Sequence, residues 1–356
     1  MSESFHFQPD WATPPGATIT SLLAERGWSN SDLAGSLDKT LEQVKDLLNG
    51  MMPIDEAIAY DLNKVFGASK SFWLAREDQY RESLCRIERN KEWVNKLPTK
   101  DVVRLGWLPK AKVEDSKISA WLDFFGVSSV TDWYEQYEGS HRLVAYRASS
   151  SFDVDEGATL AWLRQGEIEA SKIECKVWDK ESFIDALQSI RELTTRPDPE
   201  KFLPEIRNLC AQSGVAAVFA KAPSGCRASG ATKFLEKDKA LLMLSGRHKL
   251  DDHFWFTFFH EAGHLVLHDT SSLFLEGSGF VSDTEEAEAN QFSMDLLIPP
   301  EFQEDLKNLT LDPRSIIRFA KKIRVSPGIV LGQMQFSGQC PHNTRLNKLK
   351  IRYEWG

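Results

Sequence analysis

The chain has 356 residues, a length that suggests two or three domains. Hydrophobic residues make up 42% of it and charged residues 27%, which is typical of a globular protein and argues against wholesale disorder. The net charge of −9 disfavours binding of nucleic acid over the whole surface, so any contact with DNA needs a local basic patch.

The cysteines, the N-terminus and the apolar runs together indicate a cytoplasmic protein. The five cysteines are an odd number without a CxxC pair, which argues against a disulfide framework and a cysteine-rich zinc module. The first ten residues contain neither a basic start nor an apolar run, so we expect no secretory signal. No apolar stretch approaches the ~18 residues that a membrane-spanning helix needs, so we expect no membrane partner.

Residues 1–90 are predicted to form an all-helical domain. Between Ile19 and Leu84, apolar residues recur at three- and four-residue spacing, with Ser or Thr before several helices and Gly after several. The charged stretch 86–101, which contains a proline, is predicted to be a connector. A helical middle region is expected over residues 91–195, and the proline-rich segment 196–204 marks the next boundary.

A third domain of mixed structure is expected over residues 196–356. Two short apolar runs, 214–221 and 239–245, are predicted strands, and a third strand is expected between them. A long helix is predicted from about Asp252 to Asp269. Further helices are expected at residues 284–297, 313–323 and 327–336. The fold class predicted for the chain is therefore α+β, mostly helical, with a small sheet in its C-terminal domain.

The predicted long helix contains His260-Glu261-Ala262-Gly263-His264, an HExxH sequence. Residues four apart lie on one face of a helix, so the two imidazoles can converge on one tetrahedral metal ion. Such an ion lowers the pKa of its water to about 7, and Glu261 stands where it can take the proton. The motif therefore predicts a metal-dependent hydrolase.

The apolar surroundings of the motif favour a metal site over a chance match. In the stretch FWFTFFHEAGHLVL, apolar residues lie nearly all round the helix, and such a helix belongs in a core. Ionisable groups in a core are costly without partners, and a metal ion is a suitable partner. The alternative interpretation is a pair of hydrogen-bonded core histidines beside a surface glutamate.

The third protein ligand is expected from another helix. On a straight helix His268 lies about 12 Å along the axis from His260, too far to share the ion. The metzincin pattern is absent, since Thr270 stands where its third histidine should be. The acidic helix that follows offers three carboxylates, those of Glu285, Glu286 and Glu288.

Glu286 is the preferred candidate among these three. It shares a helix face with Asn290, which can brace the site by a hydrogen bond to a metal ligand. Glu285 and Glu288 are alternatives, or simply solvated. Two imidazoles and a carboxylate suit one zinc ion per chain, although they also accept manganese or iron.

The two helices resemble the ImmA/IrrE family of zinc-dependent peptidases. The stretches FWFTFFHEAGHLVLH and EEAEANQFSMDLLIP match the family's pattern of an HExGH helix followed by an ExxxN helix. The resemblance implies a zincin-like domain, with zinc held by His260, His264 and Glu286 and with Glu261 as the general base, a gluzincin-like set. Known members cleave, or are thought to cleave, Xre-type regulators, and thereby switch on stress, mobile-element or toxin–antitoxin genes.

The N-terminal domain resembles the Xre/HigA-type helix-turn-helix, through LLAERGWSNSDLAGSL and TLEQVKDLLNGMMPI. The whole chain resembles longer family members that fuse such a domain to the peptidase. A glycine is usual before the recognition helix, where this chain has Asp38. Aspartate tolerates a left-handed conformation better than most residues, so we expect the turn to survive. The candidate DNA contacts are Lys39, Thr40, Gln43 and Lys45.

The charge of this domain leaves its role open. Over residues 18–76, six basic side chains face eight acidic ones, whereas a DNA-binding domain normally presents a basic face. DNA binding through this segment therefore stands against dimerisation or docking of a partner. If the segment binds DNA, a second function is open: the protein would be a DNA-binding regulator or antitoxin, and its metal domain would be a sensor or docking module.

Several weaker signals have ordinary alternatives. Cys226 could be an inhibitory fourth ligand, but a small buried residue is the preferred interpretation. A basic cluster near the C-terminus is more simply a solvated helix face than a docking site for an acidic partner. Candidates for stabilising an oxyanion, each with a structural alternative, are His268, His342 and Arg345. The basic cluster is Arg318, Lys321, Lys322 and Arg324.

Overall fold

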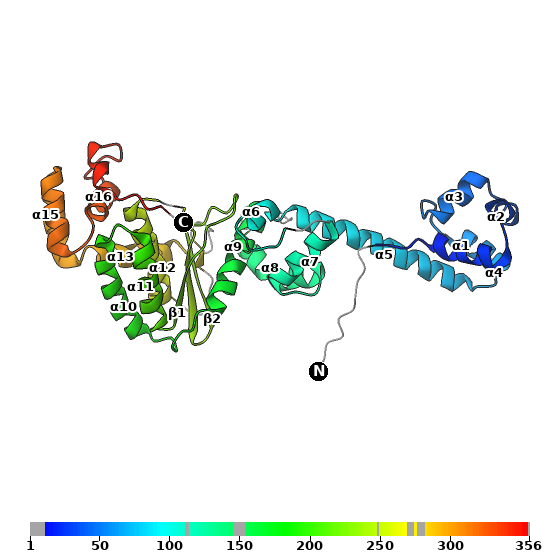
Figure 1. Cartoon of the computed structure of the whole chain (residues 1–356), viewed down its shortest axis with the longest axis horizontal. Coiled ribbons are helices and arrows are strands. Elements are labelled where there is room, and N and C mark those ends of the chain that lie inside the picture. The colour runs from blue at the N-terminus through cyan, green and yellow to red at the C-terminus, as the bar shows by residue number, and fades with distance from the viewer. Residues whose placement is uncertain are drawn as a thin grey trace. The chain divides into compact units, whose positions relative to one another are not determined.

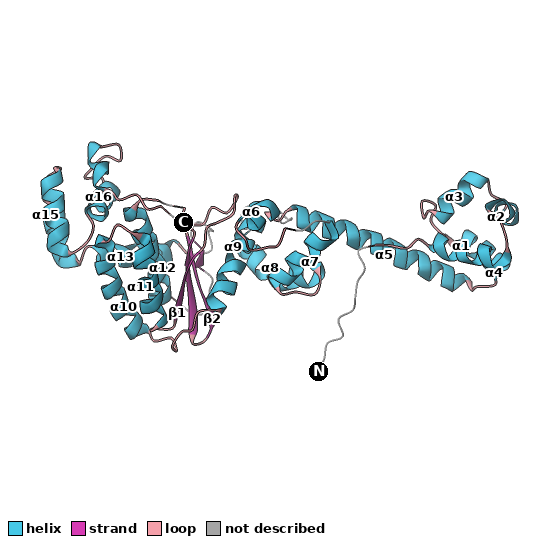
Figure 2. Ribbon diagram, in the orientation of Figure 1, coloured by secondary structure: helices cyan, strands magenta, loops and turns pink. Residues whose placement is uncertain are grey.

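The computed structural model is mostly helical and contains one small sheet (Figure 2). It describes residues 11–110, 114–144, 154–247, 249–268, 274–275 and 282–354. The chain divides into two compact units. Unit 1 comprises Met1–Asn95 and Ala111–Leu122, and unit 2 comprises Lys96–Lys110 and Asp123–Gly356. Each unit is described by itself.

Unit 1 is built on a small helical core (Figure 1). Its buried residues include Ile19 and Leu23 of one helix and Val44 and Leu47 of another, at the four- and three-residue spacing seen in the sequence. The helices around this core are α1 Pro15–Arg26, α2 Asn30–Leu37, α3 Leu41–Leu48, α4 Glu56–Phe66 and α5 Lys70–Asn95. Helix α7, Glu114–Phe125, begins in unit 1.

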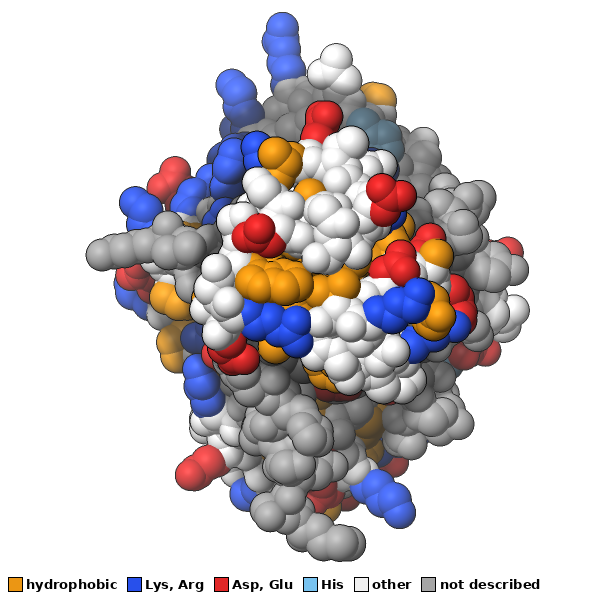
Figure 3. Space-filling view, turned by 90° about the vertical axis from the view of Figure 1, so that its right-hand side faces the viewer, with side chains coloured by type: hydrophobic (Ala, Val, Ile, Leu, Met, Phe, Trp, Pro, Cys, Tyr) orange, Lys and Arg blue, Asp and Glu red, His pale blue; other side chains and the backbone are white. Residues whose placement is uncertain are grey.

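The turn between α2 and α3 has the predicted left-handed residue. Asp38 ends α2 with φ 52°. Thr40 then caps α3: its hydroxyl accepts a hydrogen bond from the backbone N–H of Gln43, and the Gln43 side chain accepts one from the backbone N–H of Thr40. This reciprocal capping box satisfies two donors that the start of a helix leaves unpaired. On the face of the chain seen in Figure 3, which looks onto α2 and α4, basic and acidic side chains are interspersed.

The predicted connector at residues 86–101 is wrong for most of its length. Helix α5 continues through it to Asn95, and α6, Thr99–Arg104, begins directly after Pro98. The stretch is rich in Glu, Arg and Lys, which are good helix formers, and its Trp93 and Val94 are buried. Charge alone therefore marks a solvated helix face here, and only the proline breaks the helix.

The proline-rich segment 196–204 also holds the start of a helix. Asp198 caps α11, Pro199–Ala211, by accepting a hydrogen bond from the backbone N–H of Glu200. Proline is well tolerated at the first position of a helix, because that N–H has no partner within the helix. Helix α10, Lys180–Glu192, shares one core with α11, so this core begins on the N-terminal side of the prolines.

The sheet of unit 2 has the strand order β1-β3-β2-β4. β1 and β3 are parallel, with Ala217 opposite Leu242, and β2 is antiparallel to β3, with Thr232 opposite Leu242. The strands are β1 Val215–Phe219, β2 Gly230–Glu236, β3 Lys239–Leu244 and β4 Phe274–Leu275. The first three lie where the sequence predicts strands.

Helices cover both faces of this sheet (Figure 1). Because side chains alternate along a strand, Ala217 and Leu242 belong to the core formed with α10, α11 and α12, Asp251–Leu267. Val218 and Met243 belong to a second core with Trp162 of α9, Val154–Ser171. Helix α8, Val130–Val144, precedes α9.

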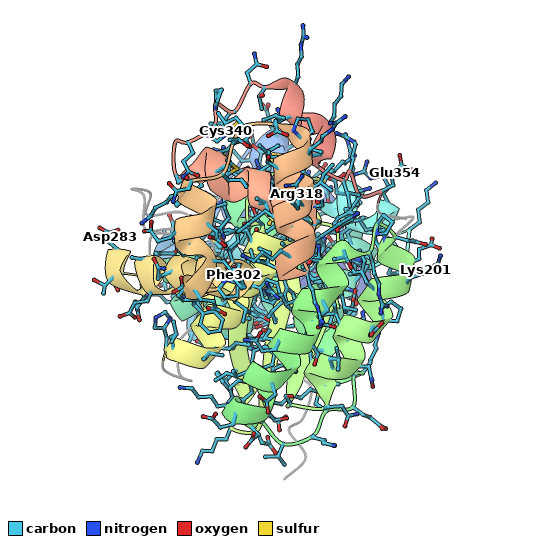
Figure 4. All side chains as sticks on the ribbon, turned by 90° about the vertical axis from the view of Figure 1, so that its left-hand side faces the viewer. Lys201, Asp283, Phe302, Arg318, Cys340 and Glu354 are labelled. Carbon is cyan, nitrogen blue, oxygen red and sulfur yellow. The ribbon has the colours of Figure 1, made fainter. Side chains whose placement is uncertain are left out.

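The remaining helices of unit 2 follow the sheet, and those that the sequence predicts begin or end within two residues of the expected positions. Figure 4 labels Asp283, which is the first residue of α13, Asp283–Leu297, and Arg318, which lies on α15, Pro313–Ile323. Among the described residues, no helix is both long and apolar enough to cross a membrane. The helices are α12 Asp251–Leu267, α13 Asp283–Leu297, α14 Gln303–Lys307, α15 Pro313–Ile323 and α16 Pro327–Phe336.

The C-terminal segment holds the start of α12 in place. Leu250 and Arg352 form a β-bridge, and the indole N–H of Trp255 donates a hydrogen bond of 2.9 Å to the hydroxyl of Tyr353. Lys350 pairs with Asp252 at 2.5 Å, and the exposed fractions of these side chains are only 7% and 8%. The helix that carries the HExxH sequence is therefore anchored at its first turn.

Candidate metal centre

Helix α12 places polar groups inside an apolar core. Phe258, Phe259 and Ala262 are fully buried, as expected for a helix with apolar residues on nearly every side. His260, Glu261 and His264 lie among them and are 4%, 1% and 2% exposed. Ionisable groups buried in this way are costly unless they are paired, so their contacts decide what the site can do.

Three side chains from two helices converge at one point. The Nε2 atoms of His260 and His264 are 3.0 Å apart, and the Glu286 carboxylate lies 3.3 Å from the first and 3.8 Å from the second. One donor atom from each of the three residues lies within 4.8 Å of the others. Two imidazole nitrogens and one carboxylate oxygen are a donor set that suits a catalytic zinc, which keeps a fourth position open.

Helix α13 packs closely against α12 beside Gly263. A Cβ at position 263 would lie 3.1 Å from the Phe292 ring and 3.3 Å from the Ala289 Cα. The glycine within the HExxH sequence therefore lets α13 pack closely on α12, which brings Glu286 to the two histidines.

The protonation states of Glu286 and His264 suit metal binding. The hydrogen bond with His260 lowers the pKa of Glu286 below its ordinary value, so its carboxylate is ionised at neutral pH. Burial, and then the neighbouring His260, lowers the pKa of His264 to about 4. A metal binds carboxylates and neutral imidazoles, so these two residues need to release no proton at pH 7.

Asn290 fixes the tautomer of His260. Its side-chain oxygen lies 3.0 Å from the Nδ1 atom of His260. An amide oxygen only accepts hydrogen bonds, so Nδ1 of His260 carries the proton. The Nε2 atom, which faces His264 and Glu286, then has a lone pair available for a metal. The structure therefore brings Asn290 to the contact that the sequence predicts for it.

His268 and Glu288 fix the tautomer of His264 in the same way. The Nε2 atom of His268 lies 3.1 Å from the Glu288 carboxylate, and its Nδ1 atom lies 3.0 Å from Nδ1 of His264. An ionised carboxylate only accepts, so His268 donates to Glu288 through Nε2 and accepts from His264 through Nδ1. This places His268 behind His264, on the side away from Glu286, and not at a position facing an oxyanion.

Two residues of β2, Thr232 and Gly230, determine the position of Glu261, and the sequence analysis predicts neither of them. The Thr232 hydroxyl donates a hydrogen bond of 3.2 Å to the Glu261 carboxylate. A Cβ at Gly230 would overlap that carboxylate, so the glycine provides the space that Glu261 occupies. The available signal was a glycine in the region where a third strand is expected, since a glycine in a strand often marks a close approach.

The weaker candidates lie outside this group of residues. Cys226 is buried with Trp162 in the core on the other face of the sheet, and burial raises the pKa of its thiol. His342 and Arg345 are exposed, and neither belongs to the His260, His264 and Glu286 cluster. In the basic cluster on α15, Lys322 pairs with Asp305 at 2.6 Å.

Residues 228–333 match the family model described as Peptidase_M78, the IrrE N-terminal-like domain. The matched segment contains β2, β3, α12 and α13, and so includes His260, Glu261, His264 and Glu286. This similarity supports a metallopeptidase, a class for which zinc is the typical metal. A search of the curated proteins gave no match to the chain.

Proposed function

We propose that this protein is a zinc-dependent endopeptidase in which His260, His264 and Glu286 hold the ion and Glu261 is the general base. The observation that carries the proposal is the convergence of two buried imidazoles and the half-buried Glu286 carboxylate, whose tautomers and charge leave the ligand atoms available. Zinc bound there would polarise the peptide carbonyl and lower the pKa of the attacking water.

The residues around the ligands have separate tasks in this proposal. Glu261 takes the proton of the attacking water, and Thr232 orients the carboxylate for this transfer. Asn290 and His268 keep the imidazoles of His260 and His264 in the tautomer that binds metal. A purely structural metal site has no use for a carboxylate placed as Glu261 is, and this favours catalysis over a scaffold role.

The proposed substrate is a protein of regulatory function in the cytoplasm. The resemblance to ImmA/IrrE peptidases supports an Xre-type transcriptional regulator or an antitoxin as the target. Its cleavage would switch on stress, mobile-element or toxin–antitoxin genes. In this proposal residues 196–356 carry the peptidase, with α10 of the middle region 91–195 completing its core.

Residues 1–90 are proposed to be an Xre/HigA-type helix-turn-helix domain. The short α2, the left-handed Asp38 and the capped α3 support this geometry. Thr40 and Gln43 already bond to each other's backbone, so contacts to DNA would depend more on Lys39 and Lys45. This domain carries the second candidate function, a DNA-binding regulator with a metal-dependent sensor or docking module. Dimerisation or docking of a partner is the alternative role of the domain.

Metal content and proteolysis, measured together on the wild type and Glu261→Gln, test the proposal. Each protein is incubated with the Xre-type regulators encoded beside it, and fragments are identified by mass spectrometry. We expect about one zinc per chain in both proteins and discrete fragments only with the wild type. Zinc in both proteins without cleavage of any regulator would favour the sensor or docking function instead.

A further inference from the structure

A cavity of about 350 Å³ in unit 2 lies beside the candidate metal centre and has no role in the reaction described so far. It is bounded by α12, α13, α16 and the C-terminal segment. None of the proposed metal ligands lines it, and neither does Glu261. Its volume is near the lower end of the range that small-ligand sites occupy, about 300–1,000 Å³. The apolar side chains that line it are Phe256, Met294, Leu297, Ile329 and Phe336.

The cavity is close enough to the metal centre to accept part of the same substrate. The Phe256 ring, which lines the cavity, stacks on the His260 ring with their centroids 6.1 Å apart. Thr257, which also lines it, precedes His260 by three residues, or about 4.5 Å along the helix. An extended peptide advances ~3.4 Å per residue. A residue one or two positions from the bond that is cut can therefore place its side chain in the cavity.

The chemistry of the lining selects an apolar side chain. The larger part of the lining surface is aromatic and aliphatic, and the side chains of His253, Thr257, Gln333 and His342 also line the cavity. At the polar end, the Lys350 ammonium lies 2.5 Å from the Asp252 carboxylate and 2.7 Å from the side-chain oxygen of Gln335. A charged side chain would lose its hydration there, and the charges of Lys350 and Asp252 already balance each other. An aliphatic or aromatic side chain loses only its contact with water.

We infer that this cavity is a specificity subsite, which takes a Leu, Met or Phe side chain of the substrate polypeptide next to the scissile bond. The inference rests on the proposed peptidase function, because it assigns the cavity to the same substrate. A missing methylene in an apolar pocket lowers specificity about 10-fold or more. We therefore expect Leu to be preferred over Ala by at least about that factor, with acidic residues disfavoured further.

The preference is measured by incubating the zinc-loaded full chain with a diverse peptide library and sequencing the cleavage sites. One position beside the cut should be enriched in Leu, Met and Phe. Met294→Trp fills the cavity from α13 and should shift that one position to Ala, Ser and Gly. Met294→Ala enlarges the cavity and should shift the same position towards Phe and Trp. Opposite shifts at a single position are not expected from a variant that merely misfolds.

Gln291→Trp is the matched control. Gln291 is exposed on the same helix, one turn before Met294, and does not line the cavity. It should leave the preference as in the wild type. Cleavage without an apolar preference, or with a preference that neither Met294 variant alters, would overturn the subsite while leaving the peptidase intact.

Binding without cleavage separates failure of the subsite from failure of the peptidase. The zinc-loaded Glu261→Gln protein is titrated with glycine-based hexapeptide amides that carry Leu, Phe, Ala or Asp at one position, followed by ligand-observed NMR. Tighter binding of the Leu and Phe peptides, lost in Glu261→Gln/Met294→Trp, supports the subsite even if no peptide is cut by the wild type. Equal binding of all four peptides, or no binding together with no selective cleavage, overturns it.

Discussion

The Nδ1 atom of His268 lies 3.0 Å from the Nδ1 atom of His264, one helical turn before it. Of these two residues, only His264 faces the metal centre. Glu288 holds the far side of the His268 ring at 3.1 Å. The proton positions that these contacts require leave the Nε2 atom of His264 available to a metal. A residue at the end of the helix therefore determines the orientation of a ligand.

His268→Ala should weaken zinc binding about 10- to 100-fold, because loss of a hydrogen-bonding partner of a metal ligand has effects of this size. Glu288→Gln should weaken it less, since the amide oxygen can still accept from His268. Competition with a chromogenic chelator measures both affinities. Unchanged affinity in His268→Ala would show that the contact does not position His264.

Gly230→Ala should abolish cleavage while zinc stays bound. The new methyl group would overlap the Glu261 carboxylate and displace it, but no proposed ligand of the ion is touched. Peptide cleavage and zinc content are measured on the same preparation. Gly35→Ala, on α2 with open space around it, is the control and should keep full activity. Full activity in Gly230→Ala would contradict the proposal that cleavage depends on the position of the Glu261 carboxylate.

Lys350→Met should destabilise unit 2 by about 3–5 kcal/mol, the usual cost of leaving one partner of a buried ion pair alone. Its partner Asp252 is 8% exposed and lies on the first turn of α12. Urea denaturation measures the change. Lys348→Met removes an exposed charge from the same segment and should change stability by less than about 0.5 kcal/mol. Equal stability of the two variants would show that the segment does not anchor α12.

Asp251 should make the protein less stable as the pH rises from about 4 to about 6. Burial raises the pKa of Asp251 to about 6, although Ser326 and the backbone N–H of Ile351 donate hydrogen bonds to it. The folded state therefore binds a proton more tightly than the unfolded state, and stability is lost as that proton leaves, by about 3 kcal/mol in total.

Asp251→Asn should remove this part of the pH dependence. Urea denaturation between pH 4 and pH 7, after chelation of metal, measures it without the pH dependence of metal binding. Asp185→Asn, an exposed residue of α10, serves as the control and should follow the wild type. If wild type and Asp251→Asn have the same slope over this range, burial does not raise the pKa of Asp251 as described.

Much of the candidate site could be predicted from the sequence, because its parts follow from helix geometry. Residues four apart on α12 face one way, which gives His260 and His264, and the shared face of Glu286 and Asn290 gives the approach of α13. The strands were predictable too, since short apolar runs bounded by Gly and charge are typical of a buried sheet. Each of these predictions uses the spacing of residues within a single helix or strand, which can be read from the sequence.

Relationships between distant elements could not be predicted. Thr232 and Gly230 precede Glu261 by about thirty residues, and only the packing of β2 on α12 makes them neighbours. The connector predicted at residues 86–101 failed for a different reason. Its charged residues are equally good for a solvated helix, and the two buried residues Trp93 and Val94 were too weak a signal to decide.

The ligands of the bound zinc ion are the sharpest test of the proposed metal site. X-ray absorption at the zinc edge, on the zinc-loaded wild type and on Glu286→Ala, reports the ligands of the ion. We expect two imidazole nitrogens at about 2.0–2.1 Å and a carboxylate oxygen at about 2.0–2.2 Å in the wild type, and loss of the carboxylate in Glu286→Ala. A zinc ion with sulfur ligands, or an unchanged spectrum in Glu286→Ala, would contradict it.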